Sequence, residues 1–326
     1  MENQQKDNII LFPKWKAILE EESLQALKQK RYLEALDKLD ELISYDVNSH
    51  EIMIGKLICL MELDRYEDAQ DLCEELIKLK DENYFHYLHI YLTILFQTSQ
   101  YQLLMEQVEY EFEADTVPMD IKEQFQQLYD MSNNMSLELK AEQYSEYINE
   151  LLEAVHENNH SKQWRTVENM RKLKVEPTKA IKELLKQESV HPVIKTTIFQ
   201  WLQEKNVSED VIIEKLNMCL TVNPTDTPRI ASHGTLKQTL LLINEMEQKN
   251  PSLFQMIEKL LYRYIYVRYP MMPPNDETVE IAEALKSVGK EYLNIHKQEE
   301  SPKQDILRYV EEIKMCETLY LSVIDE

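Results

Sequence analysis

The chain has 326 residues, a formal net charge of -23 and only three glycines. This length suffices for about two domains whose cores need no disulfide or metal, and the scarcity of glycine disfavours an antiparallel β fold rich in tight hairpins. Because the acidic residues are spread along the chain and no basic patch of convincing size interrupts them, direct binding of nucleic acid or of an anionic membrane is disfavoured.

The cysteines and the N-terminus indicate a cellular location. The four cysteines form no CxxC pair and show no metal-ligand spacing, which favours a reducing compartment. Residues 1–14 are expected to form an N-terminal extension. The apolar run from Ile9 to Phe12 is too short for a signal peptide or a membrane span. We therefore expect a cytoplasmic protein with no membrane partner.

Two segments in the N-terminal part repeat at an interval of 34 residues. Residues 30–46 (KRYLEALDKLDELISYD) align with residues 64–80 (DRYEDAQDLCEELIKLK). In both units, apolar residues recur at helical spacing on either side of a short polar turn, which predicts two helices joined tightly. One such unit cannot bury its apolar face alone, so neighbouring units must stack.

The aligned residues resemble the tetratricopeptide repeat. Its consensus places an aromatic residue three positions before an alanine, at the start of the second helix of each unit. Tyr32 with Ala35 and Tyr66 with Ala69 meet this condition. The small alanine allows two antiparallel helices to approach closely. The resemblance covers roughly residues 15–118 and implies a superhelix of stacked helix pairs.

A third unit, residues 85–118, is degenerate. Tyr101 lies 35 residues after the tyrosine of the second unit, and Leu104 replaces the expected alanine. The family's tryptophan near the start of the first helix is replaced by large apolar residues: Leu19, Met53 and Leu88. These departures preserve apolar packing but should alter the superhelix.

The resemblance implies that the first helix of each unit lines a concave surface that binds other proteins. In register with the family, the residues that face it are Glu20, Leu24, Leu27, Lys28, Ile54, Ile58, Met61, His86, His89, Thr93 and Phe96. An open alternative is that the apolar members pack on downstream helices. Some relatives hold a carboxylate at these repeats with lysine, asparagine and arginine, which are absent here. We therefore expect an amphipathic helix or a basic, extended peptide as partner.

The rest of the chain is predicted to be helical, apart from one hairpin. Residues 119–206 read as further helical pairs that continue the solenoid or form a second helical layer. Residues 207–223 contain two short β-branched runs around a polar stretch and could pair as a hairpin. Residues 207–234 therefore form a hairpin and linker, and residues 235–326 form a C-terminal helical domain. The fold class is mostly all-α.

One string has the form of a zinc-protease motif, which places two metal-ligating histidines and a general base on one helix. It is His156-Glu157-Asn158-Asn159-His160. The two asparagines are weak helix formers that should end a helix, so a capped helix terminus is the preferred interpretation. The histidines His86 and His89 lack a third ligand. We expect no metal and no cofactor.

A second alternative is a nucleic-acid-associated module. A short C-terminal stretch contains several tyrosines and arginines whose side chains could in principle stack on single-stranded bases. They are Tyr262, Arg263, Tyr264, Tyr266, Arg268 and Tyr269. The acidic charge opposes that interpretation, and packing in a core explains the cluster more simply. The sequence thus predicts a non-enzymatic adaptor or scaffold that binds another protein or peptide and takes no small-molecule substrate.

Overall fold

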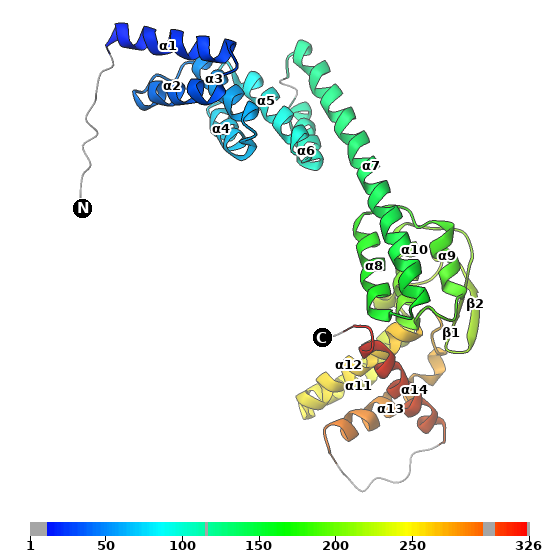
Figure 1. The fold of residues 1–326 in the computed structure, drawn as a ribbon. Coiled ribbons are helices and arrows are strands. Elements are labelled where there is room, and N and C mark those ends of the chain that lie inside the picture. The colour runs from blue at the N-terminus through cyan, green and yellow to red at the C-terminus, as the bar shows by residue number, and fades with distance from the viewer. Residues whose placement is uncertain (1–11, 115–116, 296–303, 325–326) are drawn as a thin grey trace. The chain divides into compact units, whose positions relative to one another are not determined.

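The computed structural model describes residues 12–114, 117–295 and 304–324 (Figure 1). This part of the chain is mostly helical and contains one two-stranded hairpin, as the sequence predicts. It divides into two compact units, Met1–Leu139 and Lys140–Glu326. Residues 1–11 of the expected N-terminal extension lie outside the described residues. None of the helices in the described ranges is long and apolar enough to cross a membrane.

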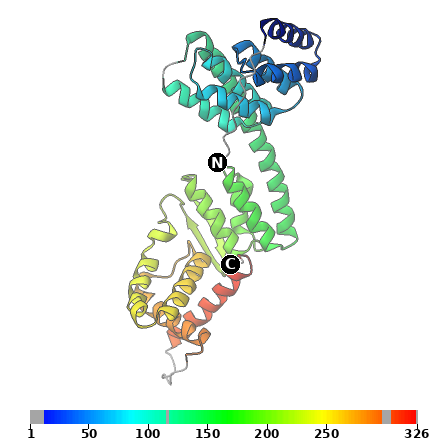
Figure 2. The ribbon, with the colours of Figure 1, turned by 90° about the vertical axis from the view of Figure 1, so that its left-hand side faces the viewer.

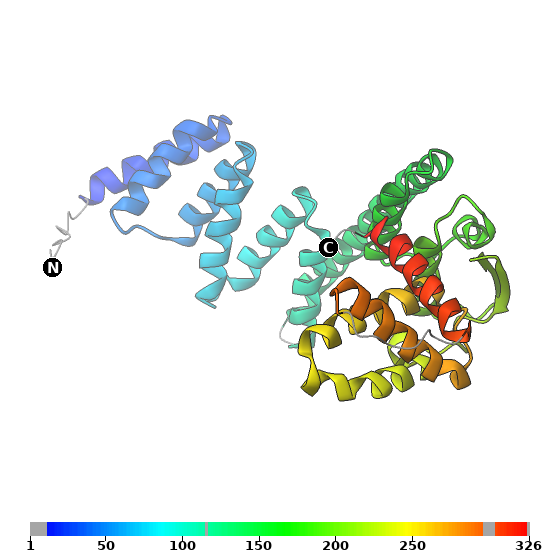
Figure 3. The same ribbon diagram turned by 90° about the horizontal axis from the view of Figure 1, so that it is seen from below.

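The first unit begins with three helix pairs. Their helices are α1 (Pro13–Lys28), α2 (Tyr32–Ser44), α3 (His50–Glu62), α4 (Tyr66–Lys78), α5 (Tyr84–Gln97) and α6 (Tyr101–Glu113). Figure 3 shows α1 to α4 in blue, each helix running back along the one before it. Consecutive helices share a single apolar core, which also includes Phe125 from the next helix. The tetratricopeptide-type architecture expected from the sequence is therefore present.

The landmark residues explain why the pairs are alike. Tyr32, Tyr66 and Tyr101 are the first residues of α2, α4 and α6. Ala35 and Ala69 are fully buried one turn later, where their small side chains permit close approach of the neighbouring helix. The large residues that replace the family's tryptophan, Leu19, Met53 and Leu88, are buried as well.

The turn inside each pair has the same backbone geometry. Lys30, Asp64 and Ser99 adopt the left-handed conformation, with φ of 59°, 57° and 59°. The amide of the next residue then bonds back to the first helix, as from Arg31 N to Ala26 O at 2.9 Å. This is the Schellman type of helix end, which usually has glycine at the left-handed position. Here all three pairs use other residues.

A single long helix, α7 (Met119–His156), crosses the division between the units. The sequence predicts helical pairs over residues 119–206, whereas residues 119–156 form one continuous helix. The Ser-Asn-Asn stretch at 132–134 does not end it, because residues 119–156 contain neither proline nor glycine. Serine and asparagine lower helix propensity by only about 0.5 kcal/mol each, too little to end a helix that is packed at both ends.

The second unit surrounds a larger core. Its remaining elements are α8 (His160–Lys172), α9 (Lys179–Glu183), η1 (Leu184–Lys186), α10 (Pro192–Glu204), β1 (Val211–Lys215), β2 (Met218–Val222), η2 (Ile230–Ser232), α11 (Gly234–Lys249), α12 (Pro251–Arg268), η3 (Asn275–Glu277), α13 (Thr278–Tyr292) and α14 (Gln304–Leu321). Figure 2 shows α11 to α14, in yellow to red, gathered on one side of this unit. Helix α12 contacts α10, α11, α13 and α14, so it lies at the centre of the core.

The hairpin predicted within residues 207–223 is confirmed. Leu216 and Asn217 form its two-residue turn, with φ of 53° and 58°. Positive φ at both positions defines a type I′ turn, which matches the twist of antiparallel strands. Val211, Ile213 and Lys215 of β1 are buried, whereas the intervening residues are exposed. One face of the hairpin therefore packs on the core.

Candidate functional site

The residues expected to face a partner in the first unit differ in exposure. Leu24 on α1 and Ile58 on α3 are 51% and 42% exposed, and they occupy equivalent positions 34 residues apart. Lys28 and His86 are also exposed. The other members of the set are half-buried: Glu20, Leu27, Ile54, Met61, His89, Thr93 and Phe96. Leu24 and Ile58 are thus the apolar members most accessible to a partner.

Several half-buried members already have partners inside the repeats. The ring of Phe96 packs edge-on against that of Tyr101, with 5.5 Å between centroids. Leu27 lies against Gly55, where an added Cβ would stand 3.3 Å from its Cδ1 atom. For these residues the alternative of internal packing describes what the structure shows. Their contribution to a binding surface stays a prediction.

Histidines gather at the start of the first helices of the second and third pairs. The rings of His50 and His86 are stacked with centroids 5.5 Å apart, and His50 Nδ1 lies 3.0 Å from the Tyr87 hydroxyl. His89 stacks on Phe125 with the ring centroids 6.2 Å apart. The pKa of His89 is lowered mainly by its burial and also by the nearby His86. The sequence reasoning missed His50, although its place at the start of α3 could have revealed the cluster.

The zinc-protease string does not form one helix. His156 is the last residue of α7, whereas His160 is the first residue of α8. Asn158 between them has φ of 54°, and the Asn159 side chain accepts a hydrogen bond from Lys162 N at 3.0 Å, which caps α8. The string therefore lacks the one-turn spacing on a single helix that the motif requires. Among the described residues, no group of three or more histidine, cysteine or acidic side chains could hold a metal ion.

The half-buried His160 instead contacts a buried histidine. Its ring lies 4.9 Å from that of His191, whose Nδ1 accepts the Val193 amide at 3.3 Å and caps α10. Burial, the proximity of His160 and the positive charge of Lys215 lower the pKa of His191 to about 4. The uncharged imidazole is therefore the form that fits this site.

The tyrosine cluster does not present a stacking platform. Tyr264 and Tyr269 are fully buried, and the Tyr269 hydroxyl donates to Gln203 Oε1 at 2.7 Å. Arg263 forms a buried ion pair with Glu317 at 2.6 Å. These contacts place Arg263, Tyr264 and Tyr269 in the core of the second unit, as the simpler interpretation expected, whereas Tyr262 is exposed.

Lys215 is a buried lysine at the end of β1. Its Nζ donates to Thr196 Oγ1 at 2.7 Å, to the Tyr269 carbonyl, and more weakly to the Pro192 carbonyl at 3.4 Å. Burial lowers its pKa well below the usual value. Three acceptors match the three protons of an ammonium group, however, and this geometry favours the charged form. The lysine joins the hairpin to α10 and to the segment after α12.

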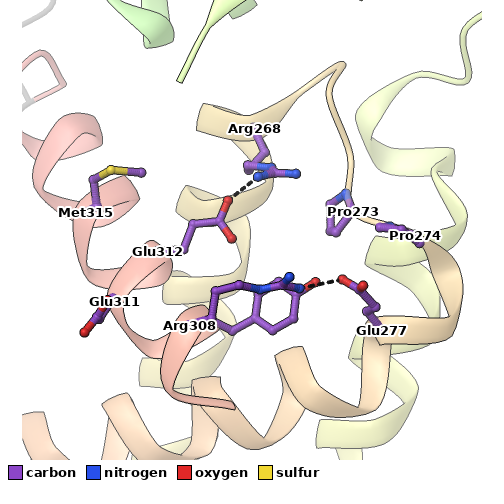
Figure 4. A pocket seen from close by; sticks show the side chains of 9 residues that line it. Arg268, Pro273, Pro274, Glu277, Arg308, Glu311, Glu312 and Met315 are labelled. Carbon is purple, nitrogen blue, oxygen red and sulfur yellow. Dashed lines mark hydrogen bonds and ion pairs between the residues drawn. The ribbon is translucent and has the colours of Figure 1, made fainter. Parts of the chain in front are cut away.

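A cavity of about 730 Å³ opens between α14 and the segment that follows α12 (Figure 4). Two ion pairs lie across it, Arg308 with Glu277 at 2.9 Å and Arg268 with Glu312. Pro273, Pro274 and Met315 supply apolar lining. The arginines are therefore already paired, and a third carboxylate, that of Glu311, leaves the lining net acidic.

Comparison with known proteins agrees with this architecture. A tetratricopeptide repeat model matches residues 26–89, and a model described as a protein of unknown function, DUF3196, matches residues 66–316. The TPR repeat-containing protein YsoA of Bacillus subtilis (strain 168) is 33% identical over 294 residues, which cover 87% of this chain and 86% of that protein. No solved structure matches the chain significantly. The chain therefore belongs to the DUF3196 family and carries tetratricopeptide repeats in its N-terminal part.

Proposed function

We propose that the chain is a non-enzymatic adaptor that binds a segment of another protein on the first helices of its repeats. Stacked helix pairs present an extended surface, and tetratricopeptide repeats generally use such surfaces to bind proteins. The observation that carries the proposal is the exposure of Leu24 and Ile58, two apolar side chains at equivalent positions of successive first helices. A partner that covers both would remove them from water.

The charge of the first unit indicates the chemistry of this partner. Residues 1–139 contain 29 acidic and 12 basic residues, so most of the net charge of -23 belongs to this unit. A basic segment would be attracted to it, and its association would be faster at low ionic strength. An amphipathic helix with basic residues beside its apolar face, or a basic extended peptide, fits both features.

The proposal is tested by affinity capture of the full chain with quantitative mass spectrometry. We expect a protein captured by the wild type to be depleted roughly tenfold or more by the double variant Leu24→Ser with Ile58→Ser, because two anchor contacts are lost. The matched control is Leu33→Ser, which changes a leucine that is 66% exposed on the second helix α2. Equal capture by the double variant and the wild type would contradict the proposed surface.

A further inference from the structure

The outer strand of the hairpin in the second unit has an open edge. In a hairpin with a two-residue turn, the residues beside the turn, Lys215 and Met218, form a hydrogen-bonded pair, and bonded and non-bonded pairs then alternate. The N–H and C=O groups of Cys219 and Thr221 therefore point away from β1. No other described segment bonds to these backbone groups, and both residues are exposed. Figure 1 places β2 on the outer side of β1.

This edge lacks the features by which proteins usually prevent strand pairing. Protected edges carry lysine, proline, a bulge or a covering loop. Strand β2 reads Met-Cys-Leu-Thr-Val and pairs with β1 in uninterrupted register. Its residue types favour the extended conformation. An added strand would find four backbone groups ready to bond.

A cavity runs beside the open edge. Met218 and Leu220 lie on the face of β2 that is directed toward the core, yet they are only half-buried, unlike their partners on β1. Together with Met271 and Met272 they line a cavity of about 550 Å³. A third strand would insert alternate side chains into this space and cover the exposed apolar surface of both β2 residues.

The charge beside this cavity indicates what the added strand carries. Arg268, Pro273 and Pro274 line both this cavity and the acidic one of Figure 4, so the two adjoin. In the acidic cavity, Glu311 adds a third carboxylate to the two ion-paired glutamates. A lysine or arginine at one end of the added strand would therefore be attracted to this cavity. A second copy of the chain brings its own net charge of -23 and is opposed electrostatically.

We propose that β2 receives an extended segment of another protein as a third strand, with apolar side chains at alternate positions and a lysine or arginine at the end near Glu311. Main-chain bonds to Cys219 and Thr221 supply affinity, and the cavity beside Met218 and Leu220 supplies selectivity, as in strand addition generally. The site belongs to the second unit and does not depend on the role of the repeats. An adaptor with both surfaces joins two partners.

The test uses the full chain and a fluorescent pool of extended peptides of about eight residues. The pool has valine, leucine, isoleucine or methionine at alternate positions, threonine between them and a C-terminal lysine. We expect anisotropy to report a Kd on the order of 10 μM. We also expect the amides of Cys219 and Thr221 to exchange rapidly in the free protein and to become protected in the complex.

Two changes, one in the protein and one in the peptide, remove main-chain hydrogen bonds between β2 and the added strand without changing the cavity. Thr221→Pro deletes an outward N–H that β1 does not use, and proline is tolerated at such edge positions. Thr221→Val is the matched control, since it keeps the N–H. We expect about tenfold weaker binding for Thr221→Pro, and also for a pool that is N-methylated at the pairing positions, and unchanged binding for Thr221→Val. Continued protection of the Leu220 and Val222 amides shows that the hairpin remains folded.

Three results would overturn the proposal. The first is absence of binding between the wild type and the pool. The second is equal binding of the methylated and unmethylated pools, because strand addition requires the peptide N–H groups. The third is a dimer in sedimentation analysis that Thr221→Pro abolishes, which would assign the edge to a second copy of the chain.

Discussion

At the scale of single residues, the turns within the repeats are built without the residue that suits them best. A left-handed conformation at a side-chain-bearing residue costs about 1 kcal/mol relative to glycine. Lys30 and Ser99 adopt this conformation at equivalent positions in the first and third pairs. Both are exposed, so a substitution there leaves the core unchanged.

We expect Lys30→Gly and Ser99→Gly each to raise the free energy of unfolding of the repeats by about 0.5–1 kcal/mol. The measurement is urea unfolding followed by circular dichroism. Glu21→Gly is the control, because it places glycine at an exposed position in the middle of α1, where a loss of about 1 kcal/mol is expected. A loss of stability in Lys30→Gly would contradict the expected conformational cost of a left-handed lysine at this turn.

At the scale of helices and strands, the sequence predicts elements better than their surroundings. The tyrosine and alanine landmarks located the helix pairs because they mark a close helix contact. The two short runs of β-branched residues around a polar stretch located the hairpin. That α7 runs unbroken was not predicted from the sequence, although residues 119–156 contain neither proline nor glycine. Which edge of the hairpin stays open depends on the packing of η1 and of Lys195 against β1, and local patterns do not encode it.

The cap of α10 gives this element a dependence on pH. His191 accepts the Val193 amide through Nδ1 and contacts His160 and, at 3.4 Å, Ser322 Oγ, and the positive charge of Lys215 acts on it. Its pKa is near 4 in the folded protein and 6.5 ordinarily, so between these values the unfolded chain binds more protons. The contribution to stability is complete above pH 6.5 and declines as the pH falls toward 4.

We expect the wild type to lose on the order of 2 kcal/mol more stability than His191→Asn when the pH falls from 6.5 to 4.5. Asparagine retains an N-cap acceptor but does not titrate. The measurement is urea unfolding at a series of pH values. Parallel curves for the two proteins would mean that folding does not lower the pKa of His191.

At the scale of the whole molecule, charge and chemistry are divided unequally between the two units. Most of the net negative charge lies in the first unit, whereas the second contains the cavities of about 730 and 550 Å³ and the open strand edge. The total charge and the repeats were evident from the sequence. The surface along β2 was not, since Met218 and Met271 are brought together only by folding.

The distribution of thiols has a practical consequence. Burial raises the pKa of Cys59 to about 11 and the pKa of both Cys73 and Cys316 to about 12, so these thiols stay protonated and shielded. Cys219 is the exposed cysteine of the four, on the outer face of β2. A maleimide dye at neutral pH should therefore attach once per native molecule, as intact mass and peptide mapping would reveal. The natural chain thus carries its own attachment point for a spectroscopic probe beside the strand edge, without an engineered cysteine.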